Sequence, residues 1–185
     1  MSSKYYFLLS SLPMLKMGEV PGITANEFLS YCSEFIHDDK WDLLKSLTLI
    51  PSGETSFSAD TLVGKYYHWE IALRNSIVRL RSANLGSSFE QFIRPEADFE
   101  VDANRSATAA YSVENPLERE RILDRERWTK IEDLEQKAAV FSYEIVCAYY
   151  LKLQLVLKWS TRNPEQAGIN LEQAAGAVYR SCSGI

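Results

Sequence analysis

The sequence predicts an all-α protein, an irregular helical bundle of about five to six helices with two long central helices. Three observations lead to this prediction. Apolar residues recur with the period of an α-helix in several windows, and helix-capping residues stand at the ends of those windows. Only two short runs, 5–9 and 47–50, have the character of strands, which is too few for a convincing sheet. With 185 residues, 46% of them hydrophobic, the chain is long enough to bury a core.

Three helices are expected before residue 87. Thr24 and Glu27 form a capping box, T-x-x-E, which marks the start of the first one. A second, short helix is expected from about Asp38 to Leu49. The third covers about 60–85 and ends at Gly86. Its apolar residues cover well over half of its circumference, so it should be packed on more than one side.

Two further strong helices are expected after residue 114. Asn115 as the N-cap and Pro116 at the first helical position begin a helix that reaches about residue 137. The next, over 142–161, is apolar nearly all round and should be the central element of the core. A weak last helix is expected after Asn170.

The segment 87–114 has no clear apolar period. A connector of this length is unusual without secondary structure of its own, so a short helix is expected inside it. We predict a single helical domain over 1–185. If the domain divides, the two parts are 1–86 and 115–185, joined by the connector 87–114.

Composition and motifs disfavour several classes of protein. The net charge of -5 disfavours a general nucleic-acid binder, which usually carries a basic excess. The three cysteines are far apart and form no C-x-x-C, which is typical of free thiols in a reducing cytoplasm. The most apolar stretch is interrupted by charges, so no membrane span is expected.

Enzyme signatures are also missing from the sequence. It has no G-x-S-x-G, G-x-G-x-x-G or H-E-x-x-H motif. Glu34 and His37 form a single E-x-x-H, whereas a di-iron bundle needs two such motifs and two further glutamates. We therefore expect no enzymatic activity, no catalytic or cofactor-binding residue, no cofactor and no metal.

Charged residues lie within the apolar faces of two predicted helices. They are Glu70, Arg74 and Arg81 on the helix over 60–85, and Glu120, Asp124 and Arg127 on the helix that begins at Pro116. An unpaired buried charge costs several kcal/mol, and the two sets are complementary in sign. We predict a structural ion-pair network between these helices. A partner-binding patch and an active site with shifted carboxylates remain as alternatives.

Arginines near the end of the helix over 60–85 form a candidate partner-binding surface. They are Arg74, Arg79 and Arg81, and Arg94 follows in the connector. Aromatic residues precede them, a combination that can stack nucleic-acid bases. The simpler interpretation is a core stripe followed by cations that compensate the helix dipole.

A series of short segments between residues 5 and 160 has a specific order. The segments are YYFLLSSLP at 5–13, WE at 69–70 with LRN at 73–75 and VRLR at 78–81, RPE at 94–96, NPLE at 115–118, LD at 123–124 with RW at 127–128, and AYYLKLQL at 148–155 with Trp159. In this order they resemble a bacterial family of unassigned function whose genes lie in clusters for V-type (A/V-type) ATPases. The family is also distantly similar to the C subunit (d in eukaryotes) of the central stalk of these rotary enzymes.

The resemblance implies a function and a set of partners. The C subunit is an all-helical funnel of three similar units that sits on the membrane rotor ring and receives the central shaft; this chain is too short for three units. The resemblance therefore implies a cytoplasmic, non-enzymatic stalk or accessory subunit that couples the shaft to the rotor ring, peripheral to the membrane only through the complex. The alternative is a soluble helical adaptor or assembly factor that is not retained in the finished complex.

Overall fold

The computed structural model describes residues 3–51, 57–86, 88–95 and 100–160. Within these ranges the chain forms seven α-helices and one 3-10 helix, and no strand. The all-α prediction is confirmed, and the number of helices is slightly above the predicted five to six. The helix expected after Asn170 lies outside the described residues.

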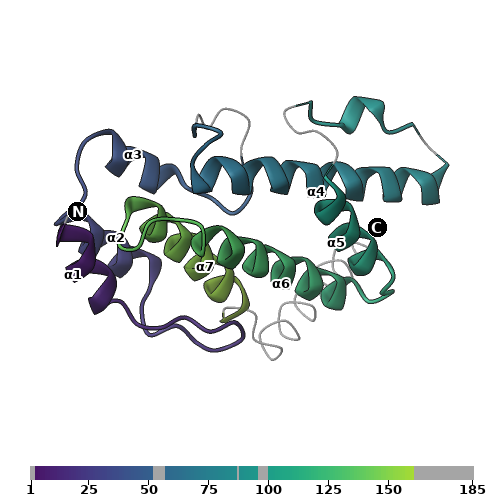
Figure 1. Ribbon diagram of the computed structural model, residues 1–185. Coiled ribbons are helices and arrows are strands. Elements are labelled where there is room, and N and C mark those ends of the chain that lie inside the picture. Colours follow the sequence, from purple (N-terminus) through teal and green to yellow (C-terminus); the bar gives the residue numbers. More distant parts are fainter. Residues whose placement is uncertain (1–2, 52–56, 87, 96–99, 161–185) are drawn as a thin grey trace, which may run out of the picture.

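Three long helices build the centre of the molecule. In Figure 1, α4 (Leu62–Leu85) runs along the top, and α6 (Pro116–Glu135) and α7 (Tyr143–Ser160) lie below it. Each of the three packs against the other two. They correspond to the expected helices over 60–85, from Pro116 to about 137, and over 142–161.

Shorter helices cover the two ends of this centre. At the left of Figure 1 lie α1 (Ser3–Ser11), α2 (Ala25–Ser33) and α3 (Asp39–Ser46), of which α1 and α2 pack against α7. Toward the right, α5 (Val101–Tyr111) crosses from α4 to α6, and the 3-10 helix η1 covers Glu90–Phe92.

Three predicted helix ends agree with the caps that form, whereas the helix expected to reach about Leu49 ends at Ser46. Thr24 and Glu27 make both bonds of the capping box at the start of α2. The side chain of Asn115 accepts a hydrogen bond from the backbone N–H of Leu117, with Pro116 in the first turn of α6. Gly86 ends α4 in the left-handed conformation, with φ of 62°.

The two runs with strand character form no strand. Residues 5–9 lie within α1, and the fully buried Leu8 anchors that helix in the core. The run 47–50 has no regular secondary structure. Side chains satisfy its backbone instead: the amide of Gln154 bonds Leu47 and Leu49, and the Tyr67 hydroxyl bonds Thr48. These hydrogen bonds satisfy backbone N–H and C=O groups of the segment, as bonds to a neighbouring strand would otherwise do.

The connector contains α5, a helix of 11 residues, so the short helix expected inside this segment is present. Its apolar period is hidden because it consists of small residues: Ala103, Ala107 and Ala110 are fully buried. Small side chains let α5 lie close to α4 and α6 together. The Ser106 hydroxyl also donates a 2.7 Å bond to Glu126 of α6. Division of the chain at the connector stays a prediction.

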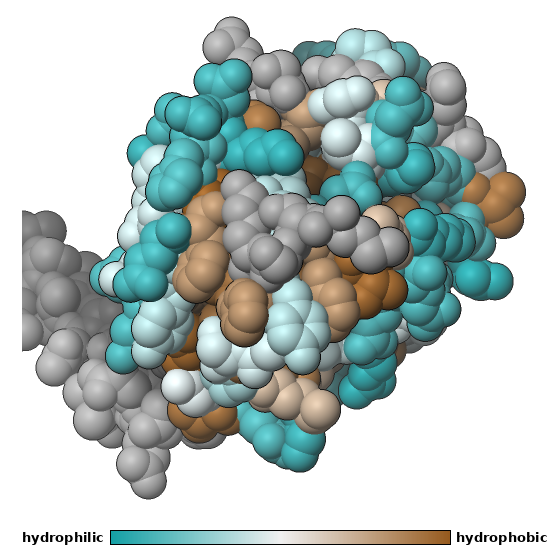
Figure 2. Space-filling model, turned by 60° about the vertical axis from the view of Figure 1, so that its left-hand side comes forward, coloured by the Kyte–Doolittle hydropathy of each residue, from teal (hydrophilic) through white to brown (hydrophobic). Residues whose placement is uncertain are grey.

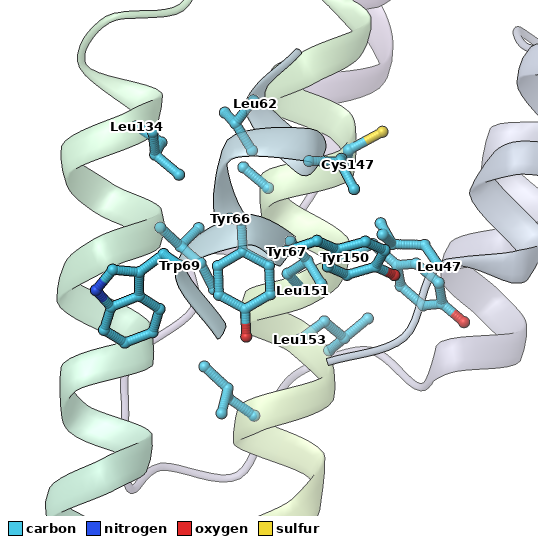
Figure 3. Close-up of a cluster of buried hydrophobic side chains, with 14 of the residues drawn as sticks. Leu47, Leu62, Tyr66, Tyr67, Trp69, Leu134, Cys147, Tyr150, Leu151 and Leu153 are labelled. Atoms are coloured by element: carbon cyan, nitrogen blue, oxygen red, sulfur yellow. The ribbon is translucent and has the colours of Figure 1, made fainter. Parts of the chain in front are cut away.

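The core contains large aromatic side chains from α4. Figure 3 shows Trp69 of α4 on the side of α6 and Tyr66 between it and Leu151 and Leu153 of α7, and all four belong to one cluster of buried side chains. All four side chains are at most 2% exposed. Among the residues that the structure describes, no helix has both the length and the apolar character needed to cross a membrane.

Candidate functional site

The most unusual feature of the core is a fully buried carboxylate, Glu70 of α4. Both of its oxygens accept hydrogen bonds from the guanidinium of Arg127 on α6: Nη2 to Oε1 and Nε to Oε2, each 2.9 Å. This parallel geometry is the strong, bidentate form of an arginine–carboxylate pair. Arg74, one helical turn after Glu70, donates a third bond of 3.1 Å to Oε1.

A second buried carboxylate, Asp124 of α6, extends the cluster to α7. Its Oδ1 accepts a 2.7 Å bond from Nη1 of Arg127. Its Oδ2 accepts a 2.9 Å bond from the indole N–H of Trp159 and lies 2.6 Å from Nζ of Lys158. Lys158 also pairs with Glu120 at the edge of the cluster. We call these residues the polar lock: Glu70, Arg74, Glu120, Asp124, Arg127, Lys158 and Trp159.

Helical spacing explains why these side chains meet. Residues three or four apart in a helix lie on the same face. Glu120, Asp124 and Arg127 therefore form one column on α6, and Glu70 and Arg74 form another on α4. Both columns sit within apolar faces, so packing of those faces brings the charges together away from water.

The charges of the polar lock balance. Three carboxylates meet three cations, and the two buried carboxylates bond at both oxygens. Burial lowers the pKa of Arg127, but the charge of Glu70 and the hydrogen bonds to it outweigh burial, so the pKa is raised. Burial and the neighbouring Glu70 raise the pKa of Tyr66 well above its ordinary value. Arg127 therefore stays charged and Tyr66 stays neutral, which suits a structural role better than proton transfer.

The structure brings together most of the predicted network residues, with one correction. Glu70, Arg74, Glu120, Asp124 and Arg127 join the lock, but Arg81 does not. Arg81 lies seven residues beyond Arg74, about two helical turns, and its guanidinium bonds the hydroxyl of Tyr111 on α5. Placing it in the network was wrong because α5, hidden in the connector, fills the space beside this end of α4.

Sequence reasoning missed two members of the lock, Lys158 and Trp159. A signal was present, since Lys158 is the last charged residue of a helix that is otherwise strongly apolar. A charge in such a helix requires a partner by the same reasoning that was applied to Glu70. The partner could be found only once α6 and α7 were known to pack together.

The four arginines proposed for partner binding have varied surroundings. Arg74 belongs to the lock, and Arg81 bonds Tyr111. Arg94 exchanges backbone bonds with the Asn75 side chain, and its guanidinium donates to the carbonyl of Pro51. Arg79 is half-buried near the end of α4. Partner binding by these arginines stays a prediction.

The comparisons with known proteins add no relative. The chain has no significant match among protein-family models, curated proteins or solved structures. The resemblance to the family from V-type ATPase gene clusters therefore depends on the ordered segments alone.

Metal-ligating and thiol groups offer no second site within the described ranges. In those ranges, no group of three or more His, Cys, Asp or Glu side chains is placed to hold a metal ion. Burial raises the pKa of the Cys32 and Cys147 thiols to about 12, which makes them poor nucleophiles. Cys182 lies outside the described residues.

Proposed function

We propose that the chain is a non-enzymatic helical stalk or accessory subunit of a bacterial V-type rotary ATPase. In this role it binds the central shaft, the cytoplasmic face of the rotor ring, or both. One observation carries the proposal. The segments that resemble the ATPase-associated family include Glu70, Arg74, Asp124, Arg127 and Trp159, and these residues form most of the polar lock.

The mechanics of the lock support a stalk role. A part that transmits torque needs helices that do not slide past one another under load. The lock joins α4, α6 and α7 by bonds that have a defined direction and length, whereas apolar packing alone permits small shifts. With 24 residues, α4 is about 36 Å long, so it can carry a load along a continuous helix from one end of the molecule toward the other.

Affinity purification from the native host tests the proposal. The tagged full-length chain is recovered in mild detergent and its partners are identified by mass spectrometry. Stoichiometric recovery with the shaft and ring subunits in active ATPase supports a stalk subunit. Recovery only with assembly intermediates supports the alternative, an assembly factor, and recovery without any ATPase subunit refutes both.

Two charge-reversal variants, compared in the same purification, test whether Arg79 contacts the ATPase. Arg79→Glu is expected to reduce recovery of the ATPase subunits while circular dichroism stays unchanged. Arg125→Glu is the control, because it makes the same change of charge at an exposed arginine of another helix, α6. Equal recovery with the two variants would count against Arg79 as a contact.

A further inference from the structure

Hydrogen-bond donors without acceptors gather around Tyr111, at the end of α5. The Tyr111 hydroxyl accepts a bond from Nε of Arg81 on α4, and the guanidinium carbon of Arg119 on α6 lies 4.2 Å from the centre of the Tyr111 ring. Arg81 makes no other hydrogen bond to the residues that the structure describes, and the Tyr111 O–H has no acceptor among them. Nη2 of Arg119 donates to the carbonyl of Val113, whereas its Nε is buried without a partner in the described chain. Three helices therefore bring unused donors to one place.

The two arginines also lack a counter-charge. Both guanidinium groups contact the same tyrosine, so they lie within about one Debye length of each other, roughly 8–10 Å at physiological salt, and repel one another. Neither forms an ion pair with a carboxylate in the described ranges. The carboxylates beside Arg119 have other partners, since Glu118 pairs with Arg121 and Glu120 belongs to the polar lock. Glu114 is exposed before the start of α6 and pairs with neither cation.

We propose that Arg81, Tyr111 and Arg119, which we call the phosphate site, bind the phosphate group of a phosphate monoester. A guanidinium binds phosphate oxygens through two parallel N–H···O bonds, which makes arginine well suited to this group. A monoester carries a charge of about −1.5 to −2 at pH 7 and three acceptor oxygens. Its charge therefore matches two cations, and its oxygens match donors from three side chains.

Charge and the number of oxygens select a phosphate monoester over other anions. A carboxylate has one negative charge and two oxygens, so a single guanidinium already satisfies it. It would leave the second arginine without a counter-charge. A phosphodiester of a nucleic-acid backbone also carries only one charge, and the net charge of -5 disfavours a nucleic-acid partner.

A bound phosphate joins three helices at one end of the molecule. Arg81, Tyr111 and Arg119 belong to α4, α5 and α6, which meet toward the right of Figure 1. The opposite end, which carries α1, differs in chemistry. Figure 2 brings that end forward and shows apolar side chains gathered among hydrophilic ones, and Phe7 of α1 is 63% exposed. The inference does not rest on the proposed ATPase role, although Arg81 is one of the arginines considered there.

Phosphorus NMR on the full-length chain tests the proposal with a defined ligand. Methyl phosphate is the probe, and dimethyl phosphate, a diester with a single charge, is the control. At low ionic strength, where charges are little screened, methyl phosphate is expected to bind with a Kd of about 1 mM or tighter, seen as broadening of its signal. Dimethyl phosphate is expected to bind at least about tenfold more weakly. Because it binds the folded state, methyl phosphate should also raise Tm.

Vesicles distinguish a soluble ligand from a lipid headgroup. Phosphatidic acid carries a phosphate monoester as its headgroup, so vesicles of phosphatidylcholine with phosphatidic acid present the same chemistry on a surface. Binding of methyl phosphate without sedimentation of the chain on these vesicles supports a soluble ligand. Binding of both, with no sedimentation on phosphatidylcholine alone, supports a lipid headgroup.

Three variants locate the binding site. Arg81→Gln and Arg119→Gln each remove one cation and are expected to weaken binding of methyl phosphate by about tenfold. Tyr111→Phe keeps the ring beside Arg119 and is expected to weaken binding several-fold through loss of the hydroxyl. Arg125→Gln is the matched control, because it makes the same change of net charge at an exposed arginine of α6 and should leave binding unchanged. Circular dichroism checks that each variant is folded.

Three results would overturn the proposal. No broadening of the methyl phosphate signal at about 10 mM ligand, well above the expected Kd, would leave the three side chains without this ligand. Equal losses in Arg81→Gln and Arg125→Gln would show that the ligand responds only to net charge. Equal binding of methyl phosphate and dimethyl phosphate would show that the doubly charged group is not recognised.

Discussion

Removing the charge of Glu70 is expected to destabilise the protein more than almost any other single change. In Glu70→Gln the side chain keeps its size, but Arg127 loses its bidentate partner while it remains only 6% exposed. Removing one member of a buried ion pair costs about 3–5 kcal/mol, because the other charge stays buried and is only partly compensated. Asp124 still bonds Arg127, so we expect about 3 kcal/mol rather than the upper limit.

Urea unfolding followed by circular dichroism measures this loss directly. In a chain of this size about 3 kcal/mol lowers Tm by about 6–12 °C. The control is Glu19→Gln, which removes a carboxylate from the exposed pair between Glu19 and Lys16. Exposed pairs contribute at most about 1 kcal/mol, so the control should unfold close to the wild type.

A double variant separates the ion pair from simple packing. Glu70→Met with Arg127→Met replaces both charges by apolar side chains of similar size. Asp124 then keeps Lys158 and Trp159, and Arg74, whose side chain is 39% exposed, can be hydrated. The double variant should therefore be more stable than either single variant. A Glu70→Gln loss below about 1 kcal/mol, or additive losses in the double variant, would refute the buried lock.

Three further predictions follow from local geometry. Gly64→Ala should destabilise the fold by several kcal/mol, although alanine normally favours a helix, because its Cβ would lie 2.1 Å from the Ser58 carbonyl oxygen; Tm measures this. In a Cys182→Ser background, Cys32 and Cys147 should resist a thiol reagent until the chain unfolds, and fast labelling would contradict their burial. Because burial raises the folded pKa of both thiols, their contribution to stability should be fully present below about pH 8.5 and be lost between there and about pH 12, as urea midpoints over that alkaline range would show.

Much of the fold could be predicted because helix ends are chemically marked. Thr24, Asn115 and Gly86 satisfy or terminate backbone groups by local rules, so their positions follow from the sequence. The helix α1 was not predicted, and α5 was expected only from the length of the connector, without a position. The run 5–9 is apolar on nearly every side, and α5 buries alanines, so neither shows the contrast between apolar and polar faces from which helices are recognised.

The site was predictable to the extent that it depends on one helix at a time. Charges at helical spacing within an apolar face are visible in a sequence, which is how Glu70, Asp124 and Arg127 were found. Which helices pack together is not visible. Lys158 was therefore missed because α7 brings it to α6, and Arg81 was misplaced because its partner is Tyr111 of α5.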